Sequence, residues 1–278
     1  MTCNQDFGRL GFAWTSPGLP LSPPGASRRA LFRYRQSLVK HVHDASRLEG
    51  NPFTYPEVQT LMDGVTVGGH RIDDARQVLN LAEAANRLFT LVETRRFRLV
   101  KPVSDRLHAL TARQEALEWG NFRGEGEEVL LTPRVMLGHR EHVPPLTEPG
   151  GRNLAELYSA GLSALARVEH PCERAMAYFL FAALHQFYFD GNKRTGRFMM
   201  NGELMMHGWD AISVPAARAR EFNETMVRFY TDRDGSGMME FLHDCRPQDV
   251  PAPPREPAGG NEPEPGTENE DDSSFDPF

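Results

Sequence analysis

The chain has 278 residues, of which 40% are hydrophobic, with a formal net charge of −7 and three cysteines. This length supports a sizeable core, and an odd number of cysteines without metal-ligand spacing argues against a disulfide framework or a zinc domain. The sequence has no run of about 18 apolar residues and no apolar signal core, so we expect a cytoplasmic protein without a membrane span.

The negative charge is concentrated at one end of the chain. Residues 251–278 hold one arginine and eight carboxylates, a charge of −7 that equals the formal charge of the whole chain. The rest of the chain is therefore near neutral, which argues against a nucleic-acid partner held by general electrostatics. Pro, Gly and Glu dominate this end, so we expect a disordered acidic tail over residues 247–278.

Residues 1–27 contain many Pro, Gly and Ser residues, which predict a disordered Pro-rich N-terminal tail. Beyond it, apolar residues recur every three or four positions, as in amphipathic helices. The expected helices cover 27–49, with Ser27 as the cap and Gly50 as the stop, and then 55–62, 73–91, 104–118, 153–168, 171–187, 216–230 and 237–243. Residues 128–142 alternate in polarity around a Thr-Pro pair and approach a glycine, which predicts a β-hairpin. The fold class is therefore mainly α with one β-hairpin.

The most informative stretch is residues 187–197, which read Phe-Tyr-Phe-Asp-Gly-Asn-Lys-Arg-Thr-Gly-Arg. An apolar face at helical spacing follows from Phe198 onward, so Asn192 falls in or near the first turn of a helix. The free N–H groups and the positive end of that helix point at this loop and favour an anion. Gly191 permits a positive φ and a close approach of a ligand to the backbone. Asn192 either ties the turn down or donates to a ligand oxygen.

The charged side chains of this stretch indicate a polyphosphate and a metal. Lys193, Arg194 and Arg197 add positive charge, and the two arginines lie three residues apart on one helix face, where both forks can bind phosphate oxygens. Asp190 stands alone among these cations, as expected of a carboxylate that holds a divalent metal bridging phosphates. Taken alone, the same stretch is also typical of a capped helix start with a solvated basic face.

Three segments carry a resemblance to one family. Residues 185–197 resemble the signature of the Fic proteins, His-x-Phe-x-Asp/Glu-Gly-Asn-Gly/Lys-Arg-x-x-Arg, and match it completely from Asp190 to Arg197. Residues 46–58, with the sequence Ser-Arg-Leu-Glu-Gly-Asn-Pro-Phe-Thr-Tyr-Pro-Glu-Val, resemble the inhibitory helix of the Fic subclass that carries this element before the core. Residues 120–123 and 143–145 resemble the stretches around the Fic target-docking flap.

The resemblance implies a Fic-type helical core over residues 71–246 with a flap hairpin at about 128–142, preceded by the inhibitory helix and N-terminal helices at 28–70. Most known Fic proteins transfer the AMP part of ATP to a protein hydroxyl. The chain would then be an autoinhibited protein adenylyltransferase that modifies Ser, Thr or Tyr of a target protein, docked at the flap, or of itself. Mg²⁺ would bind at Asp190, and ATP at Gly191, Asn192, Lys193, Arg194, Gly196 and Arg197.

The family pattern also implies a base and a restraint. Neutral His185 would be the catalytic base that takes the proton from the target hydroxyl. An ion pair from Glu49 to Arg197 would occupy the place of the γ-phosphate and keep the enzyme in a restrained state. The Ser/Thr position of the inhibitory motif holds Ala45, with Ser46 one step later, which weakens the hydrogen bond that supports Glu49.

The position of the base leaves two alignments open. His185 stands five residues before Asp190, where the family pattern has four, and the ungapped position holds Gln186. Either His185 is the base and one extra residue is absorbed before the loop, or Gln186 replaces the base. The second alignment implies a catalytically impaired nucleotide-binding regulatory module.

Further alternatives are transfer of another group and removal of AMP. A helical scaffold or DNA-binding domain is disfavoured by the near-neutral body. The identity of the target and the oligomeric state, including a homo-oligomer, stay open.

Overall fold

The structure, a computed structural model, describes residues 7–247. In that range it holds eleven α-helices, one 3-10 helix and one two-stranded antiparallel sheet, so the expected mainly α fold with one β-hairpin is confirmed. No helix within residues 7–247 combines the length and the apolar composition that crossing a membrane requires. The expected acidic tail, from residue 248 onward, lies outside the described residues.

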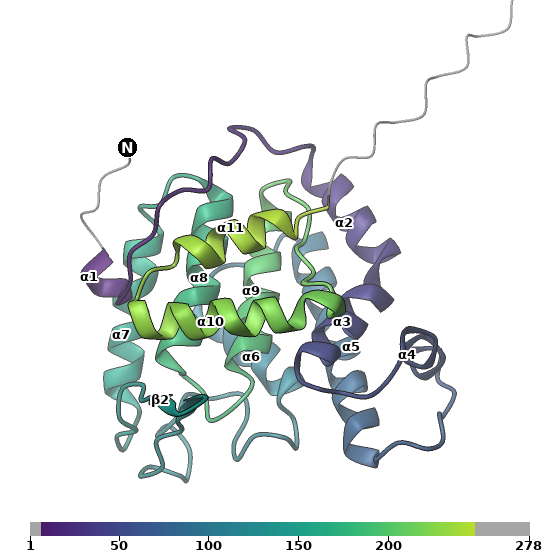
Figure 1. Ribbon diagram of the computed structural model, residues 1–278, viewed down its shortest axis with the longest axis horizontal. Coiled ribbons are helices and arrows are strands. Elements are labelled where there is room, and N and C mark those ends of the chain that lie inside the picture. The colour runs from purple at the N-terminus through teal and green to yellow at the C-terminus, as the bar shows by residue number, and fades with distance from the viewer. Residues whose placement is uncertain (1–6, 248–278) are drawn as a thin grey trace, which may run out of the picture. The chain divides into compact units, whose positions relative to one another are not determined.

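The helices and strands follow one another along the described chain, with a long connection between α6 and β1. In order they are α1 (Phe7–Leu10), α2 (Ser27–Gln36), α3 (Leu38–Leu48), α4 (Tyr55–Met62), α5 (Ile72–Glu93), α6 (Lys101–Thr111), β1 (Val135–Leu137), β2 (Arg140–His142), α7 (Arg152–Leu165), α8 (Pro171–His185), α9 (Asn192–Met206), η1 (Ala216–Arg218), α10 (Ala219–Asp232) and α11 (Ser236–Asp244). In Figure 1, α8 and α9 lie at the centre, and α10 and α11 cross in front of them.

The two central helices are buried on nearly all sides. In α8 every residue from Ala175 to Leu184 is buried, and α9 is buried over most of its length. A helix that is apolar all round belongs in the middle of a fold rather than on its surface. The C-terminus of α8 and the N-terminus of α9 are joined by residues 186–191, which we call the α8–α9 loop.

The first long helix differs from the expectation. Residues 27–49 form two helices, α2 and α3, because Ser37 adopts non-helical backbone angles and turns its hydroxyl back to the carbonyl of Arg33 at 2.8 Å. Ser27 is the first residue of α2, and Ala26 holds the cap position, so the predicted cap was wrong. Gly50, with a φ of 80°, ends this region as predicted.

Other helix boundaries also differ from the expected ones because of local backbone conformation. The helix expected at 104–118 runs from Lys101 to Thr111, ahead of Gln114, whose φ is 61°. The helix expected at 171–187 stops at His185, because Gln186 takes the left-handed conformation. By contrast, the prediction for 55–62 matches α4, which begins with a capping box at Thr54.

The predicted hairpin is present but shorter than expected. β1 and β2 pair antiparallel with Val135 opposite His142, and the chain turns at Gly138 rather than at the Thr-Pro pair. Residues 128–134 are not strand. The carboxylate of Glu128 accepts hydrogen bonds from the N–H groups of Leu130 and Leu131, which folds this stretch back on itself.

Residues 10–16 belong to the folded body, contrary to the prediction of an unfolded tail through residue 27. Leu10 and Phe12 are buried, and the backbone of Ala13 pairs with the chain next to Asp234. The indole of Trp14 donates to Glu173 at 3.3 Å. Figure 1 shows this segment, in purple, running from α1 beside α11 toward α2. Composition misled the prediction because the Pro-rich stretch begins only after these apolar residues.

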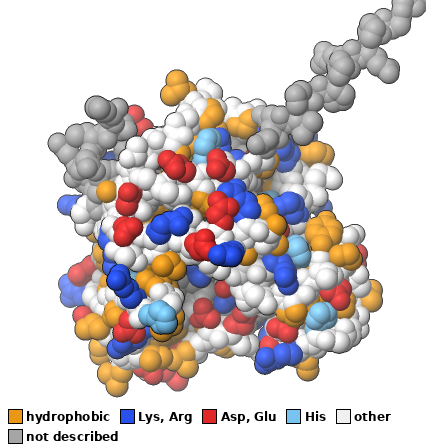
Figure 2. All heavy atoms as spheres, viewed as in Figure 1, with side chains coloured by type: hydrophobic (Ala, Val, Ile, Leu, Met, Phe, Trp, Pro, Cys, Tyr) orange, Lys and Arg blue, Asp and Glu red, His pale blue; other side chains and the backbone are white. Residues whose placement is uncertain are grey.

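The surface that covers α10 and α11 carries charges of both signs. Figure 2 shows acidic and basic side chains interspersed on this face. Several are paired along α10, as Arg218 with Glu221 and Arg220 with Glu224. No extended basic patch is seen on this face.

Phe12 tests whether the N-terminal segment contributes to the core. Its side chain is 3% exposed and meets the ring of Phe229 edge-on at 5.2 Å, whereas Phe32 is 64% exposed. We expect Phe12→Ala to lower the free energy of unfolding by about 3–5 kcal/mol and Phe32→Ala to change it by less than about 0.5 kcal/mol. Urea denaturation measures both. Equal, small effects would mean that residues 10–16 lie outside the folded core.

Candidate functional site

The α8–α9 loop has the backbone conformation that the sequence predicted. Gly191 has a φ of 71°, and a Cβ at this residue would stand 3.0 Å from the Cβ of Ala112. Both observations favour glycine. Asn192 begins α9, as expected, so the N–H groups of residues 192–194 have no carbonyl partner within the helix. This end of α9 is therefore able to bind an anion.

His108 supports the loop from behind. The N–H of Gly120 donates to its Nδ1 at 3.0 Å, so Nε2 carries the hydrogen and donates to the carbonyl of Asp190 at 2.9 Å. The imidazole also stacks on the ring of Tyr188, with centroids 3.7 Å apart. Burial lowers the pKa of His108 to about 4, which keeps the ring neutral as these bonds require. This role of His108 was not predicted, because the residue lies on an ordinary helix face.

The side chain of Asn192 ties the loop down. Its amide nitrogen donates to the carbonyl of Tyr188 at 2.7 Å and to the side-chain oxygen of Gln186 at 2.9 Å, and its oxygen accepts from the N–H of Tyr188. Both amide hydrogens are therefore used. Of the two roles predicted for Asn192, the structure contains the structural one, which leaves the backbone N–H groups to meet a ligand.

Arg194 is held between two acidic groups. Its Nη1 donates to Glu115 at 2.6 Å and to the carbonyl of Thr111, and its Nη2 reaches Asp190 at 3.4 Å. Glu115 in turn accepts hydrogen bonds from Gln77 and Asn80. Sequence reasoning missed Glu115 and its partners, because they come from α5 and the chain after α6.

Glu49 contacts Arg197 at 3.1 Å and lies 3.9 Å from the Nε of Arg194, so the predicted ion pair is present. The pair is largely buried, with side-chain exposures of 19% for Glu49 and 9% for Arg197. Burial raises the pKa of Glu49, but the charges of Arg197, Arg194 and Lys193 outweigh it and leave the pKa below its usual value. Glu49 is therefore ionised at neutral pH.

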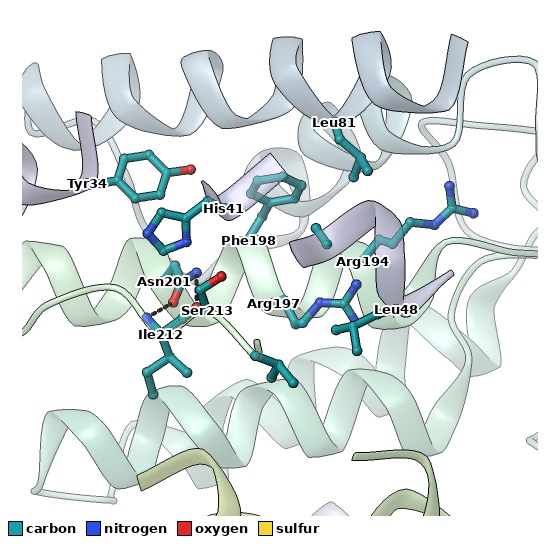
Figure 3. Close-up of a pocket in the computed structure, with 12 residues that line it drawn as sticks. Tyr34, His41, Leu48, Leu81, Arg194, Arg197, Phe198, Asn201, Ile212 and Ser213 are labelled. Atoms are coloured by element: carbon teal, nitrogen blue, oxygen red, sulfur yellow. Dashed lines mark hydrogen bonds between the residues drawn. The ribbon is translucent and has the colours of Figure 1, made fainter. Parts of the chain in front are cut away.

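Two arginine donors beside Glu49 have no hydrogen-bond partner in residues 7–247. These are Nη1 of Arg197 and Nε of Arg194, both of which are buried. Both side chains line a cavity of about 30 Å³. Figure 3 shows Leu48 beside the side chain of Arg197. Buried donors without partners are costly, so the site favours a ligand that brings acceptor oxygens.

Gly196 has a different role from the predicted one. A Cβ at Gly196 would stand 3.2 Å from the ring of Phe179 and 3.5 Å from Ala182, both on α8. The residue is buried where α8 and α9 touch, so it serves their close approach. The predicted ATP contact from Gly196 is not supported by this geometry.

The carboxylate of Asp190 is open to a metal. Its side chain is 62% exposed, and one oxygen accepts the N–H of Gly191 at 2.6 Å. No group of three potential metal ligands was found among the described residues. A Mg²⁺ ion that keeps water and phosphate ligands needs only one or two carboxylates, so Asp190 fits this ion.

Comparison with known proteins identifies this arrangement. No family model matches the chain. It is 25% identical over 216 residues to the protein adenylyltransferase Fic of Aedes aegypti, covering 76% of this chain and 40% of that protein. It is 24% identical over 225 residues to the protein of the same name from Drosophila melanogaster, covering 80% and 42%. The chain thus spans about two fifths of the length of these curated relatives.

Solved structures of Fic proteins have a similar fold. Fic-1 from C. elegans superposes with a TM-score of 0.62 at 18% identity, covering 78% of this chain and 62% of that one. A Fic family protein from Desulfovibrio desulfuricans G20 superposes with a TM-score of 0.59 at 16% identity, covering 88% and 73%. The chain is thus similar in sequence and in fold to Fic proteins. Its placement in the subclass with an N-terminal inhibitory helix stays a prediction.

His185, the base in one of the two alignments, is not hydrogen-bonded to the rest of the Fic signature within the described residues. Nε2 of His185 is hydrogen-bonded to the carbonyl of Leu10 at 2.9 Å, and the imidazole is close to the rings of Phe181 and Phe187. Burial lowers the pKa of His185 to about 4. No hydrogen bond joins this imidazole to residues 190–197 within the described structure. The predicted catalytic base is therefore not brought together with the rest of the Fic signature.

Gln186, the first residue of the α8–α9 loop, contacts the start of α9 instead. Because α8 ends at His185 and Gln186 adopts the left-handed conformation, its side chain turns inward and accepts a hydrogen bond from Asn192. The contacts thus match the alignment in which Gln186 occupies the base position. In the inhibitory motif, the Ser46 hydroxyl donates to the carbonyl of His43 at 2.8 Å and not to Glu49.

The predicted flap hairpin is fastened to the end of α8. Nε2 of His142, in β2, contacts the carbonyl of Leu184 at 2.6 Å. The buried guanidinium of Arg123 donates to the carbonyl of Gln186 at 2.6 Å, to Pro145 and to the hydroxyl of Thr147. His142 is thus a core histidine. The role of Arg123 was not predicted.

Buried histidines make the stability of the fold depend on pH. Burial lowers the pKa of His41, His108 and His185 from 6.5 to about 4. Between these values the unfolded chain binds more protons than the folded one, so the free energy of unfolding falls as the pH drops. The full loss is on the order of 3 kcal/mol for each histidine.

Urea denaturation at several pH values between about 7 and 5 measures this slope. Replacing partly buried His41 by Phe should make the slope shallower, because one of the histidines with a lowered pKa is removed. Replacing exposed His139 by Gln should leave it unchanged. A slope that His41→Phe does not alter would contradict the assignment of a buried neutral imidazole.

Proposed function

We propose that this protein binds ATP at the start of α9 and transfers its AMP part to a Ser, Thr or Tyr hydroxyl of a target protein or of itself. The observation that carries the proposal is the contact of Glu49 with Arg197 beside two buried arginine donors without partners. The proposal extends to this chain the activity named for its curated relatives.

The phosphates of ATP would bind along residues 191–194. The free N–H groups at the start of α9 and the positive end of its dipole attract their oxygens. Arg194 and Arg197, which line one cavity, supply donors, and half-exposed Lys193 adds a charge. Asp190 would hold Mg²⁺, which supplies charge neutralisation to the phosphates when bound.

The transfer step needs a proton acceptor near the α-phosphorus. The hydroxyl oxygen of the target attacks phosphorus, the bond to pyrophosphate breaks, and the imidazole of His185 accepts the hydroxyl proton. In the structure Nε2 of His185 donates its hydrogen to the carbonyl of Leu10, and burial there lowers the pKa to about 4, so the ring is neutral. In this scheme the imidazole first leaves the carbonyl of Leu10 and then accepts the proton at the nitrogen that carries no hydrogen.

The hairpin would hold the target segment. β1 and β2 form a sheet of only two strands, so each has an edge to which an extended peptide can add. Met136, in β1, is 68% exposed and offers an apolar contact on the same hairpin. Because His142 fastens the hairpin to α8, a docked peptide is held in a fixed place relative to the loop.

Glu49 would restrain the enzyme. Its carboxylate occupies donors of Arg197 that a γ-phosphate would otherwise use, so ATP binds poorly or in a pose unsuited to in-line attack. Breaking a largely buried pair leaves one charge uncompensated, at a cost of several kcal/mol. The restrained state is then the resting one, and activation requires that α3 release Glu49.

Removing the carboxylate tests the restraint. We expect Glu49→Gly to raise incorporation of label from α-labelled ATP at least about tenfold, because 1.4 kcal/mol of released restraint suffices for that factor. Glu93→Gly, an exposed change at the end of α5, is the control for inserting glycine at a helix end. Unchanged labelling in Glu49→Gly, with ATP bound, would contradict the restraint.

A second function is favoured by one observation. Gln186 lies beside the loop where the base is expected, and an amide does not accept a proton at neutral pH. The chain would then be a nucleotide-binding regulatory module that transfers nothing. The two functions share ATP binding and differ in transfer.

His185 separates the two functions. In the Glu49→Gly background, His185→Ala should lower labelling by about 10²–10⁴-fold if His185 is the base, while ATP affinity stays the same. If Glu49→Gly binds ATP but is not labelled and labels no added protein, the module is the better description. Calorimetry gives the affinity, and autoradiography gives the transfer.

A further inference from the structure

We propose that Gln186 is a positioning residue of the nucleotide site, and that its side-chain amide fixes Asn192 so that the first N–H groups of α9 face an incoming phosphate. The inference rests on the nucleotide binding proposed above. It assigns a role to a residue that the Fic signature leaves to another side chain, and it holds whether or not the chain transfers AMP.

Every polar atom of Gln186 has a partner. The side-chain oxygen accepts from Asn192 at 2.9 Å, and the side-chain nitrogen donates to the carbonyl of Ala183 at 2.6 Å and lies 3.4 Å from the hydroxyl of Tyr230. The backbone carbonyl accepts from Arg123 at 2.6 Å. With 8% of its surface exposed, the residue joins α8, α9 and α10 at one point.

The backbone of Gln186 is held in an uncommon conformation. Its φ of 48° and ψ of 59° lie in the left-handed region, which costs a non-glycine residue roughly 1–2 kcal/mol. Such residues persist where their surroundings fix them, often at functional sites. Here the conformation turns the side chain of Gln186 toward Asn192, whereas the imidazole of the preceding His185 is bonded to Leu10.

The contact decides how Asn192 uses its amide hydrogens. One goes to the carbonyl of Tyr188, and Gln186 takes the other. The oxygen of Asn192 then faces the N–H of Tyr188, which closes the α8–α9 loop from both sides. Without the acceptor on Gln186, one hydrogen of the buried Asn192 amide is left unpaired, which favours rotation of the Asn192 side chain. The loop then loses the conformation that exposes the N–H groups of α9.

Filling space does not account for the residue. A buried amide is favourable only when all its hydrogen bonds are made. An apolar side chain of similar volume would fill the same space without the cost of unpaired polar atoms. The amide of Gln186 meets this condition with partners from three helices. The link to Asn192 is the one that reaches the nucleotide site.

Hydrogen exchange tests the link without any nucleotide. The N–H of Tyr188 is bonded to the side-chain oxygen of Asn192 at 2.9 Å, so its exchange reports on that side chain. We expect Gln186→Met, which keeps the volume, to speed this exchange about threefold to tenfold, measured by NMR. The N–H of Gly120, bonded to His108, is the control and should exchange as in the natural chain. Unchanged exchange at Tyr188 would overturn the proposal.

ATP affinity tests the consequence, in the Glu49→Gly background. Gln186→Met should weaken binding about threefold to tenfold. Asn192→Ala should do the same, and the double variant should be no weaker than Asn192→Ala, because the two act through one contact. A residue that only supports the fold would give losses that add, and additive losses would overturn the proposal.

Failure of the proposed function gives a different pattern. If the Glu49→Gly protein binds no ATP, nucleotide binding is refuted, and the exchange of the Tyr188 N–H still decides whether Gln186 fixes Asn192. If it binds ATP and Gln186→Met binds equally well, only the positioning role is refuted. Phe12→Ala, a destabilising change in the N-terminal segment, shows how much affinity is lost through reduced stability alone.

Discussion

Two helix ends of opposite polarity meet at the site, and the protein satisfies only one of them. The last carbonyls of α8 are the negative end of its dipole, and they accept hydrogen bonds from Arg123 and His142. The first N–H groups of α9, a few residues later, have no side-chain cap. Because the α8 end is already occupied by fixed donors, an anion that approaches the junction meets the open end of α9.

The charges around this junction nearly balance without a ligand. Glu49, Glu115 and Asp190 face two arginines and the neighbouring Lys193. The helix that carries Glu49 is itself held in place, because buried Asp44 of α3 accepts a hydrogen bond from Ser213 and another from the N–H of Ala216. A polyphosphate that binds here, as proposed above, would therefore compete with an internal carboxylate whose position the fold secures, and its binding would be coupled to any movement of α3.

The sequence predicted the parts of the site that are local in the chain. The left-handed Gly191 and the start of α9 follow from residues within one turn of each other, and motif resemblance brought in the distant pair of Glu49 and Arg197. The missed contributors, such as His108 and Arg123, act through contacts more than 60 residues away along the chain. Nothing in a single helix pattern distinguishes such residues from ordinary core or surface positions.

The neighbouring residues His185 and Gln186 show why the spacing of the signature alone did not decide which residue occupies the position of the catalytic base. Both lie at the end of one helix, and a single left-handed residue sends their side chains to different partners. Returning His185 to the loop requires that its imidazole leave the carbonyl of Leu10, which leaves a largely buried acceptor unpaired at about 1–3 kcal/mol.

Moving the N-terminal segment away instead would expose Leu10 and Phe12, and burying one such side chain is worth about 1.5–3 kcal/mol. Rotation of the imidazole is therefore the less costly route. A cost of about 1–3 kcal/mol still leaves the competent state at between roughly a sixth and less than a hundredth of the molecules. Transfer through His185, as proposed above, would be reduced by the same factor even after Glu49 has been released.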